Sequence, residues 1–175
     1  MPITDWLADY LRYTDNSEPQ SSYRLWTGIS TIAAALERKV WLNWDDAIYP
    51  NLYVVLVGPP AARKGTAMSQ GEWFLRRLGD KRVNMAANST TFPALVKRLV
   101  TGMKKIKRDE ETDYVHNSVS AFARELMSLF RGGDDLNSIV AFFIEAYDCK
   151  LYEKETIKDG QSLIKAPFLN LVGGT

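Results

Sequence analysis

The pattern of apolar and polar positions divides the chain into a helical beginning and a longer part in which strands and helices alternate. Apolar side chains recur at helical spacing over residues 22–38. A shorter helix is expected over residues 4–13, with Thr4 as its N-cap. We therefore predict an N-terminal helical segment, residues 1–50, packed on a core formed by residues 51–175.

The second part begins with residues 52–57, which are apolar without polar alternation, as is typical of a strand covered on both faces. The strands expected after it cover residues 82–87, 118–123 and 168–172, and a hairpin is expected over 151–164. The expected helices are 66–78, one that is capped by a hydroxyl of residues 89–91 and ends near 101, one that starts at 125, and one from 134 or 135 to 147. A charged loop is expected over 104–112. This alternation predicts an α/β domain with a mostly parallel sheet and flanking helices.

Composition excludes several classes of protein. A chain of 175 residues with a net charge of +1 has the size of one domain and lacks an overall basic footprint for nucleic acid. Its single cysteine, Cys149, suits a reducing compartment, and we see neither a signal peptide nor an apolar run of membrane-spanning length. We expect a cytoplasmic protein without a membrane partner. Because the chain stops just after the apolar residues 168–172, we also expect an incomplete core.

The junction after residues 52–57 carries the most informative chemistry. It reads Gly58, Pro59, Pro60, Ala61, Ala62, Arg63, Lys64, Gly65, Thr66. A strand, a loop and a helix N-terminus together present unpaired N–H groups and partial positive charge to a phosphate, and a lysine just inside the helix adds a full charge. The run therefore predicts a P-loop that binds a nucleoside triphosphate.

The match to the P-loop pattern G-x-x-x-x-G-K-[ST] is incomplete. Gly58 and Lys64 are correctly spaced, whereas Arg63 takes the second glycine position and Gly65 takes the Ser/Thr position. The run is closer to the G-x-P-G-x-G-K-G-T variant of nucleotide kinases such as adenylate kinase, with Ala61 and Arg63 in place of two glycines. Those glycines matter because glycine tolerates positive φ and lets the backbone approach phosphate. The alternative is a Gly-Pro-Pro turn with a solvated lysine.

Phosphoryl transfer also needs Mg²⁺ and an acid near it. Glu125 follows the expected strand 118–123, which we expect next to the P-loop strand, and is the candidate for metal ligand and water-orienting base. The alternative is a carboxylate that stabilises the first turn of its own helix. Thr66 is the candidate hydroxyl ligand of Mg²⁺, or else an exposed helical threonine. Asn170 or Thr175 could sense the γ-phosphate, or the Gly-Gly before Thr175 is an ordinary turn.

Three further features are weaker. One is a cluster of basic residues at the end of an expected helix and in the loop after it, which could contact DNA or form a solvated face. Its members are Lys97, Arg98, Lys104, Lys105, Lys107 and Arg108. His116 has no partners at metal-ligand spacing, so we assign it no metal role. Cys149 is expected to be a small core residue rather than a nucleophile.

Several segments together resemble a known family. They are Leu25–Ser30 with Ala33–Leu42, Tyr49–Tyr53, the Arg63-Lys64 loop, Arg124–Leu126, Ala146–Asp148 and Asn170–Thr175. Over roughly residues 22–175 the chain resembles the phage and prophage P-loop ATPases linked to primase–helicase replication proteins, which are related to RecA-like helicase domains. In that family Arg-Lys is an accepted form of the loop. The resemblance implies that Gly58, Lys64, Gly65 and Thr66 contact the nucleotide, that Glu125 is the Walker B-type acid, and that a sensor follows Asn170.

The leading hypothesis is an ATP-binding, Mg²⁺-dependent motor domain of a phage-type replicative helicase or a related DNA-processing ATPase, with ATP and Mg²⁺ as cofactors. Its expected partners are the nucleotide, single-stranded or duplex DNA, and further copies of the full-length protein. Two alternatives remain open. One is a nucleotide or small-molecule kinase, for which Arg124 and Arg131 are the candidate lid arginines. The other is a non-catalytic nucleotide-binding or assembly module.

Overall fold

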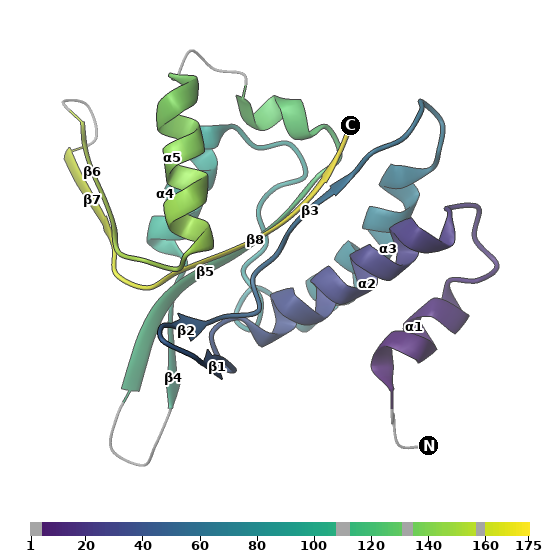
Figure 1. The fold of residues 1–175 in the computed structure, drawn as a ribbon, viewed down its shortest axis with the longest axis horizontal. Helices are drawn as coiled ribbons and strands as arrows, with labels where there is room; N and C mark the ends of the chain where they lie inside the picture. Colours follow the sequence, from purple (N-terminus) through teal and green to yellow (C-terminus); the bar gives the residue numbers. More distant parts are fainter. Residues whose placement is uncertain (1–4, 108–112, 131–134, 157–159) are drawn as a thin grey trace.

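A computed structural model describes residues 5–107, 113–130, 135–156 and 160–175 (Figure 1). These residues form an α/β fold with a mixed, mostly parallel sheet of four strands, as the alternating pattern predicts. Within the same residues, no helix has the length and apolarity needed to cross a membrane.

The four-stranded sheet has the order β3-β8-β5-β4. β3 (Tyr53–Leu56) and β5 (Asp113–Ala123) both run parallel to the central strand β8 (Pro167–Gly174), whereas β4 (Met103–Lys107) is antiparallel to β5. We expected the strand that leads to Glu125 to lie next to the P-loop strand. That expectation was wrong, because β8 pairs with both of them and separates β3 from β5.

Helices cover both faces of this sheet (Figure 1). The helices on one face are α4 (Phe92–Thr101) and α5 (Leu136–Tyr147), whose apolar residues share a core with the odd-numbered positions of β5 and β8. On the other face, α2 (Ser21–Leu36) and α3 (Lys64–Leu78) pack with β3 and with Phe122 and Val172. This two-sided burial explains why β8 is buried at every position and lacks polar alternation.

Helix α1 (Trp6–Tyr13) packs outside α2, and its ring contacts with Phe74 tie it to α3. Its N-cap is Asp5, whose side chain accepts a hydrogen bond from the Ala8 amide. The expected cap, Thr4, lies outside the described residues.

Two small hairpins complete the fold. One is formed by β1 (Leu42–Asn43), which pairs with β2 (Ala47–Ile48). The predicted hairpin over 151–164 is confirmed as β6 (Tyr152–Thr156) and β7 (Gly160–Ile164).

Three predictions of local structure differ from the structure. The expected loop over 104–112 begins instead as strand β4. The expected strand over 82–87 makes only an isolated bridge from Met85 to Ser120 of β5. The helix expected from residue 125 is a short 3₁₀ turn, Leu126–Phe130.

Candidate nucleotide-binding site

The candidate site lies where the parallel strands end. Leu56 of β3 is in register with Gly174 of β8, and Gly173 is in register with Ala123 of β5. The carboxyl ends of β3, β8 and β5 therefore meet at one edge, close to the C-terminus in Figure 1. In open α/β sheets, ligands bind in the crevice outside the carboxyl ends of the strands.

The loop between β3 and α3 takes an unusual backbone path. Ala61 and Arg63 have φ of 66° and 60°, in the left-handed region that usually needs glycine. These are the two positions at which the nucleotide-kinase variant has glycine. The chain therefore keeps the conformation that glycine favours even though both glycines are absent.

Unpaired backbone donors gather in this loop. Ala62 and Thr66 donate their amides to Pro59 O and Arg63 O within it. Among the described residues, no hydrogen bond uses the amides of the other non-proline residues from 61 to 65, namely Ala61, Arg63, Lys64 and Gly65. Successive N–H groups at left-handed residues, next to a helix N-terminus, form the kind of concavity that binds anions. The two prolines contribute no donor.

Lys64 is the first residue of α3, and its side chain folds back over the loop. The Nζ atom donates to Gly58 O at 2.6 Å and to Pro59 O at 2.9 Å. The side chain is half-buried, and its ammonium group lies against the loop rather than in open solvent. A phosphate bound in the loop would replace these two neutral carbonyl acceptors with an anion, which adds attraction between opposite charges to the hydrogen bond.

Two side chains from the helical N-terminal segment hold the loop from outside. The Tyr23 hydroxyl of α2 donates to Val57 O at 2.9 Å. It also lies so close to Gly58 that a Cβ there would collide with it, so a larger residue would have to displace this hydroxyl. Glu18 forms an ion pair with Arg63, which directs this guanidinium to the outer side of the loop.

Arg124 stands at the end of β5, where a Walker B-type segment would carry an aspartate. Its Nη2 donates to Ser69 Oγ at 3.0 Å and lies 3.9 Å from a carboxylate oxygen of Glu72. Both partners belong to α3, and the buried Glu72 is also paired with Arg76 at 2.6 Å. This network fixes the first turns of α3 to the end of β5.

The remaining candidates at this edge are exposed. Glu125 follows Arg124, and no hydrogen bond or ion pair within the described chain involves its carboxylate. Thr66 lies in the first turn of α3, and Thr175 follows β8, where its amide donates to Leu56 O at 3.3 Å. The structure thus brings the loop, Thr66, Arg124, Glu125 and Thr175 to one edge of the sheet.

Asn170 lies elsewhere. It is fully buried four positions before the end of β8, where its Oδ1 accepts from the Leu52 amide at 3.1 Å. Its Nδ2 donates to Ser30 O at 3.2 Å and to Ser30 Oγ at 2.8 Å. Because these bonds occupy the side-chain amide, the position of Asn170 argues against a role as γ-phosphate sensor and favours a structural link between β8 and α2.

Two other residues were assigned no site role, and the structure shows their surroundings. Burial raises the pKa of the Cys149 thiol to about 11, which keeps it protonated at neutral pH. His116 is buried, and its Nδ1 lies 2.6 Å from Ser118 Oγ. Within the described ranges, no group of three or more His, Cys, Asp and Glu residues is arranged to hold a metal ion.

Sequence patterns did not reveal the residues that support the loop. Tyr23 and Glu18 hold the loop from the N-terminal segment, and Ser69 and Glu72 of α3 hold Arg124 beside it; none of the four belongs to the loop pattern. Glu72 could have been noticed in the sequence, because it is an acidic residue on the buried side of α3, two turns after Lys64, and a buried acid needs a partner.

Comparison of the chain with protein-family models, with curated proteins and with solved structures finds no match. Any function for this site therefore has to be argued from its own geometry and chemistry.

Proposed function

We propose that the chain binds ATP through the loop 58–66 and hydrolyses it with Mg²⁺, as the motor domain of a phage-type replicative helicase or related DNA-processing protein. The observation that carries this proposal is the set of unpaired amides between Ala61 and Gly65, next to the Lys64 ammonium group and the N-terminus of α3. Backbone donors, a lysine and a helix N-terminus at one point match the needs of a triphosphate.

The oxygen donors at this edge fit a magnesium ion. Mg²⁺ prefers one or two carboxylates together with water and substrate phosphates, and Glu125 and Thr66 offer a carboxylate and a hydroxyl that have no other partner in the described chain. When bound, the ion would neutralise charge on the phosphate oxygens. Glu125 would in addition accept a proton from, and orient, the attacking water.

Arg124 gives this site its own character. A guanidinium in place of the usual aspartate adds positive charge at the edge where the γ-phosphate would lie, while Ser69 and Glu72 hold it in position. Arginine binds phosphate oxygens in a bidentate manner, so Arg124 can contribute to binding the anion. The same substitution removes one potential metal ligand, which favours slow turnover.

The decisive experiment is nucleotide titration of Lys64→Ala by calorimetry, with ATP and Mg²⁺. Loss of a charge-assisted bond of about 1.5–3 kcal/mol predicts an affinity that is weaker by about tenfold or more. Lys150→Ala is the control, because Lys150 is an exposed lysine away from the loop. An unchanged ATP affinity in Lys64→Ala would refute the assignment of the loop.

Turnover separates the alternatives. Glu125→Gln should keep ATP affinity and lower the hydrolysis rate by about 10²-fold or more, since it retains the shape but removes the base. Phosphate transfer to nucleoside monophosphates in a coupled assay would favour the kinase instead. ATP binding without hydrolysis, with or without single-stranded DNA, would favour a non-catalytic module. This outcome is worth testing because Arg124 stands where the usual pattern has an aspartate.

A further inference from the structure

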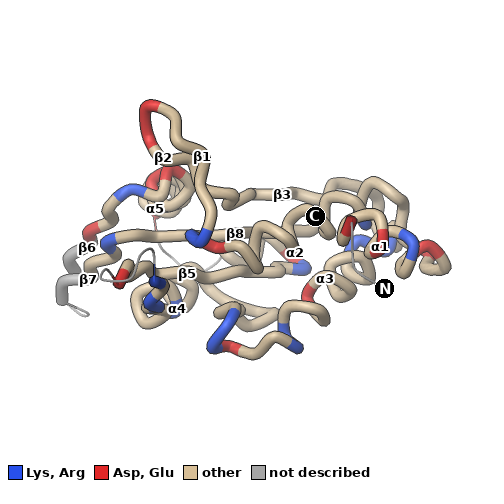
Figure 2. The backbone as a smooth tube through the Cα atoms, turned by 90° about the horizontal axis from the view of Figure 1, so that it is seen from below, with Lys and Arg blue, Asp and Glu red and all other residues tan. Residues whose placement is uncertain are grey.

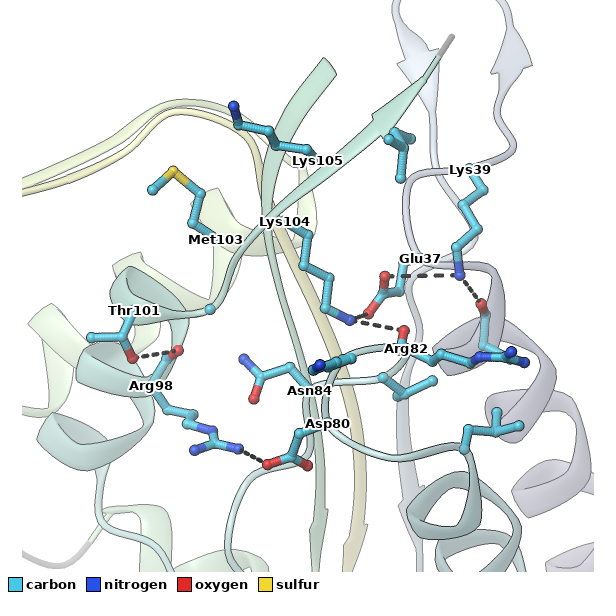
Figure 3. Close-up of a pocket in the computed structure, with 16 residues that line it drawn as sticks. Glu37, Lys39, Asp80, Arg82, Asn84, Arg98, Thr101, Met103, Lys104 and Lys105 are labelled. Atoms are coloured by element: carbon cyan, nitrogen blue, oxygen red, sulfur yellow. Dashed lines mark hydrogen bonds and ion pairs between the residues drawn. The ribbon is translucent and has the colours of Figure 1, made fainter. Parts of the chain in front are cut away.

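A second concave site lies at the other end of α3. It is a cavity of ≈ 840 Å³ bounded by the end of α2, the segment after α3, the end of α4 and the start of β4 (Figure 3). Helix α3 has 15 residues, so at 1.5 Å per residue the cavity and Lys64 are separated by about 20 Å. The cavity is therefore distinct from the candidate nucleotide site.

Basic side chains dominate the lining. Its charged members are the basic residues Lys39, Lys81, Arg82, Arg98, Lys104 and Lys105 and the acidic residues Glu37 and Asp80. Figure 2 shows that Lys and Arg positions lie beside α4, whereas the β1–β2 hairpin on the opposite side of the sheet carries acidic positions.

Both acids are already neutralised by partners within the cavity. Glu37 is paired with Lys104, which also donates to Arg82 O at 2.9 Å. Asp80 is paired with Arg98 at 2.9 Å (Figure 3). The lining therefore carries surplus positive charge.

Three cations of the lining have no such partner. The side chains of Lys81, Arg82 and Lys105 are exposed, and within the described chain no hydrogen bond or ion pair engages their charged groups. All three line the cavity, from the segment after α3 and from β4, and Lys105 lies at its rim because its side chain extends away from the Lys104–Glu37 pair (Figure 3).

The floor of the cavity is shielded from solvent at Lys104. Only 14% of the Lys104 side chain is exposed, and burial lowers its pKa, although the ion pair with Glu37 opposes this shift. An additional anion in the recess would stabilise the charged form of Lys104.

We propose that this cavity binds the phosphate groups of a single nucleic-acid strand. Unpaired cations around a recess match the electrostatic footprint of a phosphate backbone. A duplex is stiff on this length scale and could touch only the rim, whereas a single strand can bend into the recess. The described lining contains no aromatic side chain on which bases could stack, so binding is independent of base sequence and strongly salt-dependent.

The test is fluorescence anisotropy with a labelled oligo(dT) of about 12 nucleotides, within the usual site sizes for single strands. The full chain is used without nucleotide, and the test variant combines Lys81→Gln, Arg82→Gln and Lys105→Gln. Because each neutralised phosphate contributes about 0.7 to the slope of log K against log salt, loss of three contacts should reduce that slope by about 2. Affinity at low salt should fall by about tenfold or more.

The matched control removes the same charges elsewhere. Arg12→Gln, Lys150→Gln and Lys165→Gln lie on exposed surface outside the cavity, and this variant should bind within about twofold of the original chain. Thermal melting confirms that both variants remain folded.

Three outcomes would overturn the proposal: no binding by the original chain, equal losses in both variants, or displacement of the oligonucleotide by tripolyphosphate at the same molar concentration. The last would mean that the recess takes a small polyphosphate and not a strand. Lys64→Ala should bind oligo(dT) normally, because Lys64 lies outside the cavity. Failure of the oligonucleotide test would therefore leave the ATP proposal unaffected, and failure of the ATP titration would leave the strand-binding proposal unaffected.

Discussion

Substitution of Ala61 by glycine tests the backbone conformation on which the nucleotide proposal rests. Ala61 has a φ of 66° and is exposed, so the substitution removes no buried contact. Arg63 has a similar φ, but its substitution would also break the ion pair with Glu18. Ala61 is therefore the cleaner probe.

The expected magnitude follows from two opposing effects. An L-residue in the left-handed region costs about 1–2 kcal/mol, which glycine would not incur. Glycine loses more conformational entropy on folding, which costs roughly 0.5–1 kcal/mol. We expect Ala61→Gly to raise the free energy of unfolding by about 0.5–1 kcal/mol, and hence the melting temperature by roughly 1–4 °C for a chain of this size.

Urea denaturation followed by circular dichroism measures this change, and the neighbouring Ala62→Gly is the control. Ala62 does not have positive φ and packs partly buried against the core of α2, α3 and β3, so glycine there brings the entropic cost and also removes a methyl contact. Stability should therefore fall by about 0.5–1 kcal/mol or more. If the two variants shift stability in the same direction, the loop does not have the left-handed conformation at Ala61. The anion-binding concavity of backbone amides would then not form as described.

Three further predictions concern the supports of the two sites. Tyr23→Phe removes the hydrogen bond to Val57 O and should lower the free energy of unfolding by about 1 kcal/mol. Tyr13→Phe is the control, because Tyr13 is exposed and its substitution should leave stability unchanged in the same denaturant melts. Asn170→Ala leaves the Leu52 amide unpaired and removes two hydrogen bonds to Ser30, so it should cost about 2–4 kcal/mol. ATP turnover per folded molecule should be unchanged, and reduced turnover at full folding would restore the sensor role. Burial raises the pKa of Glu37 above 4.5, so the folded state holds the Glu37 proton more tightly than the unfolded state, and stability is lost as pH rises through the folded pKa. Thermal melts from pH 4 upwards should show this loss in the original chain and not in Glu37→Gln. The same pH dependence in both proteins would contradict the prediction.

The elements that the sequence predicted well are those with a strong local pattern. The apolar run that became β3, the helical spacing of α2 and the Asp135 cap of α5 each depend on neighbouring residues only. The left-handed conformation at Ala61 and Arg63 also agrees with the loop pattern, which has glycine at these two positions.

The predictions that failed depend on pairing between distant segments. The lysines of β4 suggested a loop, but an edge strand exposes alternate side chains, and β4 is held by its antiparallel pairing with β5. The position of β8 between β3 and β5 could not be read from an apolar run, because such a run fits any central strand. For the same reason the contacts of Tyr23 and Asn170 emerged only in three dimensions.

The charge at the two ends of α3 has different physical origins, and this bears on both proposals. At the N-terminus the helix itself supplies partial positive charge, so the loop needs only Lys64 to attract an anion. At the C-terminus the helix supplies partial negative charge, so Arg76 and Arg77 in the last turn also have a purely structural explanation. Lys81, Arg82 and Lys105 have no such explanation, because they lie beyond the last turn or on β4, and the dipole effect falls off within that turn. The case for a bound strand therefore depends on these three cations, whose charge does not stabilise the helix.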